Sequence, residues 1–490
     1  MLKSDKKLRK HQCEAILHLG KSKKGLVALP TGTGKSLLAM VYYKKLQMKG
    51  VLDKCVFVTE KNVLDQIDET SEVFFNTPLN ILTIKGWWTP ARRKKEYAKS
   101  DDFEIIVINY QKLKADLPFF VNLLMDNKVH LILDEGTAIK NPKSRTSKDV
   151  SKLAKLATRV MVMTATPVMK NLEDLYWILV NASIIKYSYP RFKDNFCKVE
   201  PRWVPGPFGR RRKVDQIVGY KNVSQFYELF ADKFFTRKKS DVTDMPPFQI
   251  IKSRLTQTPE TKDALNFLAG EYEIVPKALI QIANSAPAII LGTKTSIPTK
   301  AQDFIRYIDN NLENKMIVYT KYAKVAKYIT ALFNKNYGYD IAVVIHGGTK
   351  DTQAVKSKFL EDDRVKLLVG TQSIAKGVDG LQAVTDTVGF YDLPDTIGDF
   401  LQIIGRISRI GTKFTSFNLF IPMVEKSIDE TLFTSLQTQI ALLKKVHPDS
   451  IEEGIEDEMV QKVFDENTEP DTWVKKELME VYEKYGITIE

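Results

Sequence analysis

Short apolar runs separated by longer stretches with apolar residues at helical spacing recur along the first 170 residues, and the pattern begins again near residue 300. The runs are too short for helices and end in polar or turn-forming residues, so they predict buried strands. The predicted strands are 26–29, 55–59, 105–108, 130–133, 160–163, 316–319, 341–345 and 366–369. This alternation of strand and helix indicates an α/β fold with parallel sheets.

Length and composition bound the fold further. A chain of 490 residues is too long to fold around one hydrophobic core, and its length suggests two or three domains. No apolar run approaches the roughly 18 residues that a membrane span needs, so we expect no membrane partner and a cytoplasmic protein. Its three cysteines, Cys13, Cys55 and Cys197, lie far apart, which indicates neither a zinc site nor a disulfide framework.

A glycine-rich turn after the first predicted strand is the clearest chemical motif. It comprises Thr31, Gly32, Thr33, Gly34, Lys35 and Ser36 and opens a helical pattern. Gly32 and Gly34 allow the backbone N–H groups to converge on phosphate oxygens. Lys35 would reach the β- and γ-phosphates, and the Ser36 hydroxyl would bind Mg²⁺. The motif therefore predicts an ATP site with magnesium, although Leu29 replaces its usual first glycine.

Two carboxylates follow the predicted strand 130–133 directly. Burying such charges is costly unless they have a function. Asp134 could hold Mg²⁺ opposite Ser36, and Glu135 could polarise the water that attacks the γ-phosphate. Thr164 and Thr166 follow the next strand, where their hydroxyls could sense the phosphate and couple its state to a nucleic-acid groove.

Charge points to a polyanionic partner. The formal net charge is +13, but residues 451–490 hold 13 acidic and 4 basic residues, which leaves +22 on the rest. Polar and basic residues at strand ends and in one basic loop are candidate nucleic-acid contacts. They are Lys61, Asn109, Tyr110, Arg210, Arg211, Arg212, Thr320, Lys321, Gly347, Thr371 and Gln372. For any single one of them a solvated surface role is an equal alternative, whereas Trp87 and Trp88 are expected to pack in a core or an interface.

The order of motifs resembles one family. Residues 134–144, with Ile-Lys-Asn-Pro after Asp-Glu, and residues 164–175, with Asn-Leu-Glu-Asp-Leu, are similar to the second and third motifs of the Swi/Snf-type branch of superfamily 2 helicases. Residues 402–411 resemble its sixth motif. One departure is Gly136-Thr137, where the family usually has Ala-His. That histidine couples the ATP state to the rest of the site, so coupling is in question here, although a threonine hydroxyl can still hydrogen-bond.

The resemblance covers roughly residues 8–425 and implies two RecA-like domains. In such ATPases a glutamine in the position of Gln12 reads adenine, and Gln402 would join the ATP site. Arg406 and Arg409 are expected on one face of a helix, as arginines that reach the triphosphate. The implied domains are 1–180 and 299–425, separated by a helical insertion with a basic loop at 181–298 and followed by a helical, acidic extension at 426–490.

The resemblance implies a DNA-dependent ATPase that translocates on mainly double-stranded DNA and remodels bound protein or branched DNA. A strand-separating DNA or RNA helicase, the motor subunit of a nuclease or repair assembly, and a nucleotide-gated clamp without catalysis are the alternatives. A protein partner from a repair, recombination or remodelling complex is also expected. The acidic tail is either a solvated end or a segment that restrains a basic groove.

Overall fold

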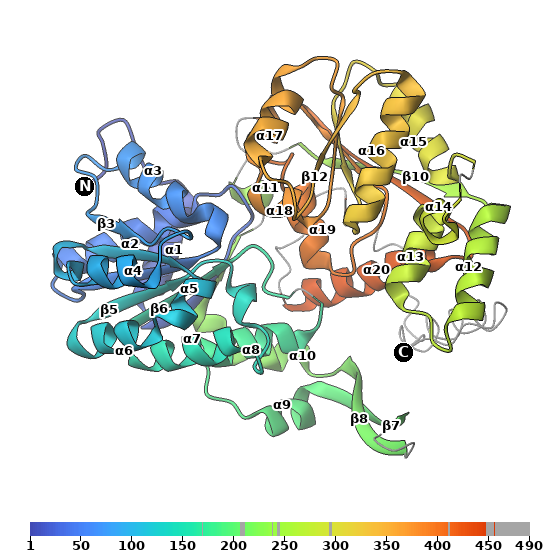
Figure 1. The fold of residues 1–490 in the computed structure, drawn as a ribbon. Helices are drawn as coiled ribbons and strands as arrows, with labels where there is room; N and C mark the ends of the chain where they lie inside the picture. Colours follow the sequence, from blue (N-terminus) through green and yellow to red (C-terminus); the bar gives the residue numbers. More distant parts are fainter. Residues whose placement is uncertain are drawn as a thin grey trace. The chain divides into compact units, whose positions relative to one another are not determined.

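Two parallel sheets organise the computed structural model, which describes residues 1–168, 170–205, 211–237, 239–242, 246–293, 296–409, 412–446 and 455. The chain divides into two units, built mainly from Met1–Thr243 and from Asp244–Ala441. Each unit has its own sheet and helices (Figure 1). The prediction of two parallel-sheet α/β domains is therefore confirmed.

The first unit has a seven-stranded sheet, counted over the described residues, in the order β3-β4-β2-β5-β6-β1-β9. All of its paired strands run parallel. The strands are β1 (Lys24–Ala28), β2 (Lys54–Thr59), β3 (Ile81–Thr83), β4 (Ile105–Asn109), β5 (Val129–Leu133), β6 (Arg159–Thr164) and β9 (Phe234–Thr236). Its helices include α1 (Lys10–Gly20), α2 (Lys35–Met48), α3 (Leu64–Phe74), α4 (Pro90–Tyr97), α5 (Tyr110–Ala115), α6 (Leu117–Asp126), α7 (Arg145–Leu156), α8 (Leu172–Asn181), α9 (Tyr189–Phe196), α10 (Val223–Glu228) and α11 (Lys239–Val242).

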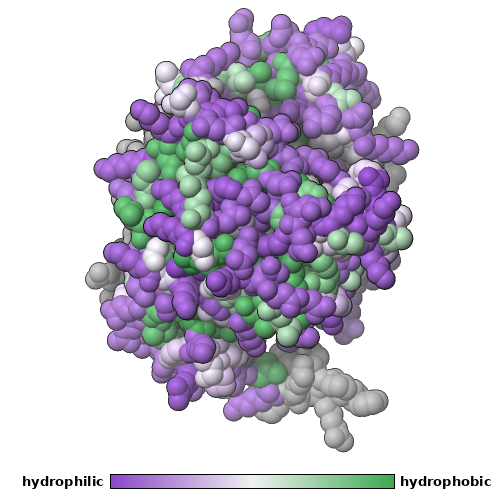
Figure 2. All heavy atoms as spheres, turned by 90° about the vertical axis from the view of Figure 1, so that its left-hand side faces the viewer, coloured by the Kyte–Doolittle hydropathy of each residue, from purple (hydrophilic) through white to green (hydrophobic). Residues whose placement is uncertain are grey.

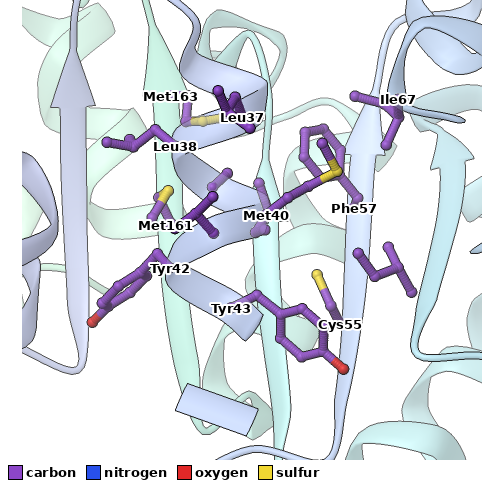
Figure 3. Close-up of a cluster of buried hydrophobic side chains, with 14 of the residues drawn as sticks. Leu37, Leu38, Met40, Tyr42, Tyr43, Cys55, Phe57, Ile67, Met161 and Met163 are labelled. Atoms are coloured by element: carbon purple, nitrogen blue, oxygen red, sulfur yellow. The ribbon is translucent and has the colours of Figure 1, made fainter. Parts of the chain in front are cut away.

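Helix α2 lies against the sheet, and its residues from Leu37 to Tyr43 are all buried. Figure 3 shows its side chains Leu38, Met40 and Tyr43 among Phe57 and Met161 of neighbouring strands. A helix buried on every side cannot slide without opening cavities in the core. The core therefore fixes the start of α2, which is the end that follows the glycine-rich turn.

The segment 181–298 differs from the helical insertion that the sequence predicts. It contains an antiparallel pair, β7 (Cys197–Pro205) and β8 (Arg211–Tyr220), which projects from the first unit in Figure 1. Later stretches of the segment complete the two sheets, because β9 pairs with β1 and β10 (Phe248–Leu255) pairs with β15 (Phe417–Val424). The aromatic residues at 226, 230 and 234 are buried and pack on one another, as expected for core residues.

The second unit has a six-stranded parallel sheet in the described residues, in the order β10-β15-β14-β11-β13-β12. Its remaining strands are β11 (Met316–Tyr319), β12 (Ala342–Ile345), β13 (Leu367–Gly370) and β14 (Thr387–Phe390). Its helices are α12 (Pro259–Glu271), α13 (Lys277–Ser285), α14 (Pro287–Leu291), α15 (Thr299–Asp309), α16 (Ala323–Tyr337), α17 (Thr352–Glu361), α18 (Gln372–Gly377), α19 (Ile397–Ile404) and α20 (Ile428–Val446). A buried ion pair, Lys300 Nζ to Asp429 Oδ2 at 2.8 Å, ties α15 to α20.

Figure 2 shows hydrophilic residues over most of the face that it presents, with hydrophobic residues in separate patches. Among the helices in the described ranges, none is long and apolar enough to cross a membrane.

Candidate nucleotide site and catalytic residues

The glycine-rich turn connects the end of β1 to the start of α2. Gly32 and Gly34 have φ of +76° and +80°, a region that only glycine adopts readily. Lys35 is the first residue of α2, and its Nζ donates to the carbonyl oxygens of Leu29 at 2.9 Å and Pro30 at 3.0 Å. The Lys35 ammonium group therefore lies across the turn that the sequence assigns to phosphates.

The side chain of Gln12, on α1, forms a hydrogen bond with this turn. Its side-chain amide donates to Gly34 O at 3.1 Å, and its oxygen accepts the backbone N–H of Arg9 at 2.9 Å. The φ of +80° favours glycine at position 34, and a Cβ there would lie 2.5 Å from Gln12 Nε2 and would displace the Gln12 amide from the turn. His11, which sequence analysis did not single out, also contacts the turn, with Nε2 3.0 Å from Thr33 O. The Gln12 role in adenine binding stays a prediction.

Asp134 follows β5 at the carboxyl edge of the sheet. Its Oδ2 accepts the Thr59 hydroxyl at 2.8 Å, and its backbone oxygen accepts the Tyr110 hydroxyl at 2.7 Å. Burial raises the pKa of Asp134, while the positive charge of Lys35 acts in the opposite direction. The two partners fix both the side chain and the backbone of this carboxylate.

Glu135 has the most constrained geometry of the predicted catalytic residues. Its φ is +50°, which is unusual for a residue with a side chain and indicates local strain. Its Oε1 accepts the hydroxyls of Thr137 at 3.2 Å and Thr164 at 3.3 Å. Burial, followed by the neighbouring Asp134 charge, raises its pKa. The structure thus brings Thr137, Thr164 and Glu135 together.

Thr164 and Thr166 connect this carboxylate to β1. Both are fully buried, and the Thr164 hydroxyl accepts the Thr166 N–H at 3.1 Å. The backbone oxygen of Thr164 accepts the N–H of Leu29, which precedes the glycine-rich turn, at 3.2 Å. One residue therefore contacts both Glu135 and the strand that leads into the turn.

Packing against β6 explains why residue 136 is a glycine. A Cβ at this position would lie 2.2 Å from Val162 Cγ1, so the alanine that the related motif usually carries does not fit here without a shift. The two motif extensions also meet, because Lys140 Nζ lies 3.7 Å from Asp174 Oδ2. Asp174 in turn accepts the backbone N–H of Lys170 at 2.9 Å.

The donor set at this edge suits magnesium shared with phosphates. Ser36 supplies a hydroxyl and Asp134 a carboxylate, which are the hard oxygen donors that Mg²⁺ prefers. Within the described ranges no group of three His, Cys, Asp or Glu residues forms a protein-only metal site. A magnesium ion held by one carboxylate and by substrate oxygens needs no such group.

The second unit carries Thr320 and Lys321 after β11. The Thr320 side chain is buried and hydrogen-bonded to Asp392. Lys321 Nζ contacts Asp395 and donates to Gln281 Oε1 at 3.1 Å. These two predicted nucleic-acid contacts therefore have partners within their own unit.

The sequence predicted that Arg406 and Arg409 share one face of a helix, and the structure contradicts this prediction. Helix α19 ends at Ile404, and both arginines lie in the turns that follow. Asp379 brings them together instead, with Arg406 Nη1 3.0 Å from its Oδ1 and Arg409 Nη1 bonded to the same oxygen. The prediction was wrong because it extended the helix beyond Ile404. No sequence pattern identified Asp379 as the partner that both arginines share.

Gln402, on α19, belongs to a polar group in the second unit. Its Oε1 lies 3.4 Å from Gln372 Nε2, which also donates to Asp399 Oδ1 at 2.8 Å. Thr371 is buried, whereas Gly347 is exposed.

The remaining nucleic-acid predictions fall in the first unit. Lys61 is exposed, whereas Asn109 is buried as the cap of α5 and Tyr110 is buried with its hydroxyl on Asp134. Arg210 lies outside the described residues, and Arg211 and Arg212 begin β8.

The prediction of a core position is wrong for Trp87, because the residue is 71% exposed.

Two family models match this chain. Residues 5–169 match "Type III restriction enzyme, res subunit", and residues 299–411 match "Helicase conserved C-terminal domain". These ranges contain most of the first sheet and the central strands of the second.

Among curated proteins, the chain is 26% identical over 328 residues to SWI/SNF-related matrix-associated actin-dependent regulator of chromatin subfamily A-like protein 1 of Xenopus tropicalis, covering 64% of this chain and 33% of that protein. It is 21% identical over 360 residues to the DNA annealing helicase and endonuclease ZRANB3 of Bos taurus, covering 70% and 32%. The chain therefore spans about a third of the length of these relatives. Among solved structures, the Hef helicase domain of Pyrococcus furiosus matches with a TM-score of 0.50 and 17% identity over 87% of this chain and 97% of that one, which supports the fold.

Proposed function

Since this chain belongs to the Swi/Snf-type branch of the superfamily 2 helicases, we propose that it is a nucleic-acid-dependent ATPase that moves along DNA. Nucleotide binding follows from the helicase models that match both units. The translocation itself, its preference for duplex DNA and the individual residue roles are the proposal.

The observation that carries the proposal is the position of Glu135. A buried carboxylate held by two hydroxyls, next to Asp134 and within the field of Lys35, suits a group that orients and deprotonates water. Thr164 connects that carboxylate to the strand before the glycine-rich turn. Binding at the turn would therefore act directly on the residue that activates water.

The mechanism assigns each group one task. The turn and Lys35 bind the phosphates, and Ser36 and Asp134 would hold Mg²⁺, which neutralises charge on the phosphate oxygens when bound. Glu135 accepts a proton from the attacking water. Gln12 and Gln402 are proposed to contribute to nucleotide binding, and Thr164 and Thr166 to coupling. Arg406 and Arg409 of the second unit would stabilise the charge that develops on the transferred phosphoryl group.

DNA is the proposed track for two reasons. One relative is named a DNA annealing helicase and another a regulator of chromatin. The chain outside residues 451–490 carries a net charge of +22, which favours a phosphate backbone. A protein partner from a remodelling or repair complex belongs to the same proposal.

A strand-separating helicase is the second candidate, because β7 and β8 form a projecting antiparallel pair in the first unit. Such an element could act as a wedge that separates the strands of a duplex. Shortening this pair would abolish unwinding in a helicase but leave duplex translocation in place.

The test is steady-state ATP hydrolysis with no nucleic acid, single-stranded DNA, duplex DNA or RNA. We expect stimulation chiefly by duplex DNA, with hydrolysis lost in Lys35→Ala and lowered about a thousandfold in Glu135→Gln. Asp126→Asn, an exposed acid on α6, is the matched control and should behave as wild type. Stimulation only by RNA or single strands would favour the second candidate, and absence of hydrolysis under all conditions would reject the motor.

A further inference from the structure

Trp87 forms an exposed aromatic surface beside a cation. Its ring meets that of Trp88 edge-on, with centroids 6.3 Å apart. The Arg92 guanidinium lies over both rings, 4.8 Å from the Trp87 centroid and 4.7 Å from the Trp88 centroid. Since Trp87 is 71% exposed, Arg92 can cover only one side of its ring. We call Trp87, Trp88 and Arg92 the tryptophan platform.

The structure does not need this ring to hold α4 in place. Arg93 carries that task, with its Nε 2.6 Å from Asp116 Oδ2 and its Nη1 2.9 Å from Trp88 O. Tyr97, one turn later, donates to the same carboxylate at 2.7 Å. Helix α4 is therefore fixed by buried polar contacts on its other side, and the exposure of Trp87 calls for another explanation.

Further cations lie on the segments next to the platform. Lys61, from the segment after β2, lies against Gly86, since a Cβ there would be 3.0 Å from Lys61 Cε. Lys94 and Lys95 are exposed on α4. Among the described residues, no carboxylate oxygen lies within 4.0 Å of the charged nitrogens of Lys61, Arg92, Lys94 or Lys95, whereas Lys85 nearby is bonded to Asp65.

The platform lies at the edge of the sheet that also bears the catalytic carboxylates. It follows β3, Lys61 follows β2 and Asp134 follows β5, and these strands belong to one parallel sheet. The carboxyl ends of parallel strands meet at one edge. A nucleic-acid strand bound there would meet phosphate-binding cations and a flat aromatic face together.

We propose that Trp87 stacks on an unpaired nucleobase, so that the DNA this protein prefers has a single-stranded or branched segment next to the duplex. Aromatic rings flanked by cations are the usual means of holding unstacked bases without sequence preference. A paired base inside a duplex cannot offer its face to Trp87. This inference rests on the proposed function, because it names the DNA structure on which that motor acts.

The test compares binding of the full chain to forked DNA and to blunt duplex DNA of equal length, at one salt concentration. We expect Trp87→Ala to weaken fork binding about tenfold and duplex binding less than twofold. Trp87→Phe should recover most of the loss. Phe267→Ala, which removes an exposed aromatic ring from α12, is the matched control and should change neither.

A second arm uses wild-type protein and changes the DNA. Forks whose single-stranded arms carry abasic sites keep their phosphates but lack the bases. They should bind wild type as weakly as intact forks bind Trp87→Ala, and Trp87→Ala should not distinguish them. A joint Lys94→Ala, Lys95→Ala variant should weaken fork and duplex alike and lower the salt dependence of both.

Equal binding of intact and abasic forks by wild type would overturn the inference, as would an equal loss on fork and duplex in Trp87→Ala. Retained fork binding by Trp87→Ala would overturn it too, and a protein partner that binds the exposed ring would then be the remaining explanation. ATP hydrolysis by wild type on duplex DNA tests the motor separately. The stacking role of Trp87 can thus be rejected while the proposed motor function is retained. Absence of any stimulated hydrolysis would reject the motor function, whatever the result for Trp87.

Discussion

The carboxyl edges of the two sheets hold their charged groups in different ways. At the first edge, Asp134 and Glu135 accept hydrogen bonds from threonine hydroxyls, and Lys35 donates to backbone carbonyls. At the second edge, cations contact carboxylates, as Lys321 does with Asp395 and the arginine pair does with Asp379. A hydroxyl or a carbonyl group orients a charged side chain, whereas an acidic partner also competes with an incoming phosphate for the cation.

This difference suggests separate tasks. The first edge orients its charged groups with hydroxyls and carbonyls, whereas at the second edge a phosphate that binds Arg406 must compete with Asp379 for the guanidinium group. Four tests would break or sharpen the comparison, and they are described from the largest expected effect to the smallest.

Arg406→Ala should have the largest effect. Losing the guanidinium that we propose to stabilise the transferred phosphoryl group is expected to lower the nucleic-acid-stimulated kcat about a thousandfold. Asp379→Asn removes one charge from the shared partner and should lower kcat about tenfold, through poorer orientation of both arginines. Steady-state hydrolysis measures both. Arg364→Ala, at an arginine that is 81% exposed, is the control, and near-normal kcat in Arg406→Ala would show that this arginine has no catalytic role.

Gly136→Ala tests how tightly the first edge is packed. The new Cβ would lie 2.2 Å from Val162 Cγ1, so we expect a loss of about 1–3 kcal/mol in the free energy of unfolding of the first unit, measured by urea denaturation. In a double-mutant cycle, the cost of Gly136→Ala should be smaller on a Val162→Ala background, because the clashing methyl is gone. Gly270→Ala in α12 meets no atom within 4 Å and should be neutral or slightly stabilising. Equal effects of the two glycine substitutions would contradict the packing argument.

Thr137→Val removes one hydroxyl from Glu135 while keeping the shape of the side chain. That hydrogen bond lowers the pKa of Glu135, against the increase that burial causes. A base must be deprotonated, so activity falls as pH drops through its pKa, and the variant should lose activity at a higher pH than wild type. At neutral pH we expect kcat to fall about tenfold. Thr137→Ser should restore the pH profile, and an unchanged profile in the valine variant would assign Thr137 a packing role.

His130 gives the smallest expected effect. It is fully buried in β5, both ring nitrogens have no hydrogen-bond partner among the described residues, and burial lowers its pKa to about 3. The unfolded chain takes up a proton below about pH 6.5 while the folded chain does not, so stability is present above that pH and falls as pH decreases. We expect about 1 kcal/mol of loss between pH 7 and 5.5. His130→Leu should remove this part of the pH dependence from the first unit, and an unchanged dependence would assign it to other groups.

The sequence predicted what local patterns encode. Strands 55–59, 105–108 and 130–133 are apolar runs with polar residues only at their ends, Thr59 and His130, and all three lie in the first sheet. The turn at Gly32 and Gly34 followed from a motif whose glycines are required by the backbone. These features depend on neighbours in sequence, which is why they could be recognised without a structure.

Contacts between distant residues could not be predicted in this way. Asp379 binds two arginines that follow it by 27 and 30 residues, and neither charge pattern nor spacing reveals the pairing. Strand β7 carries two prolines, and both β7 and β8 carry charges, which favour a loop by composition, yet the two strands pair with each other. Trp87 is hydrophobic by type, and only the structure shows that it is exposed and that Arg93 and Tyr97 already fix the helix that follows it.

The strand order also sets when each unit can fold during synthesis. The last strand of the first sheet, β9, ends at Thr236, so that sheet can be completed once residues up to 236 have left the ribosome. Strand β10 must instead wait for β15, because Phe248 pairs with Phe417. During that interval β10 lacks the strand with which it pairs in the described sheet, whereas every strand of the first sheet has already been synthesised.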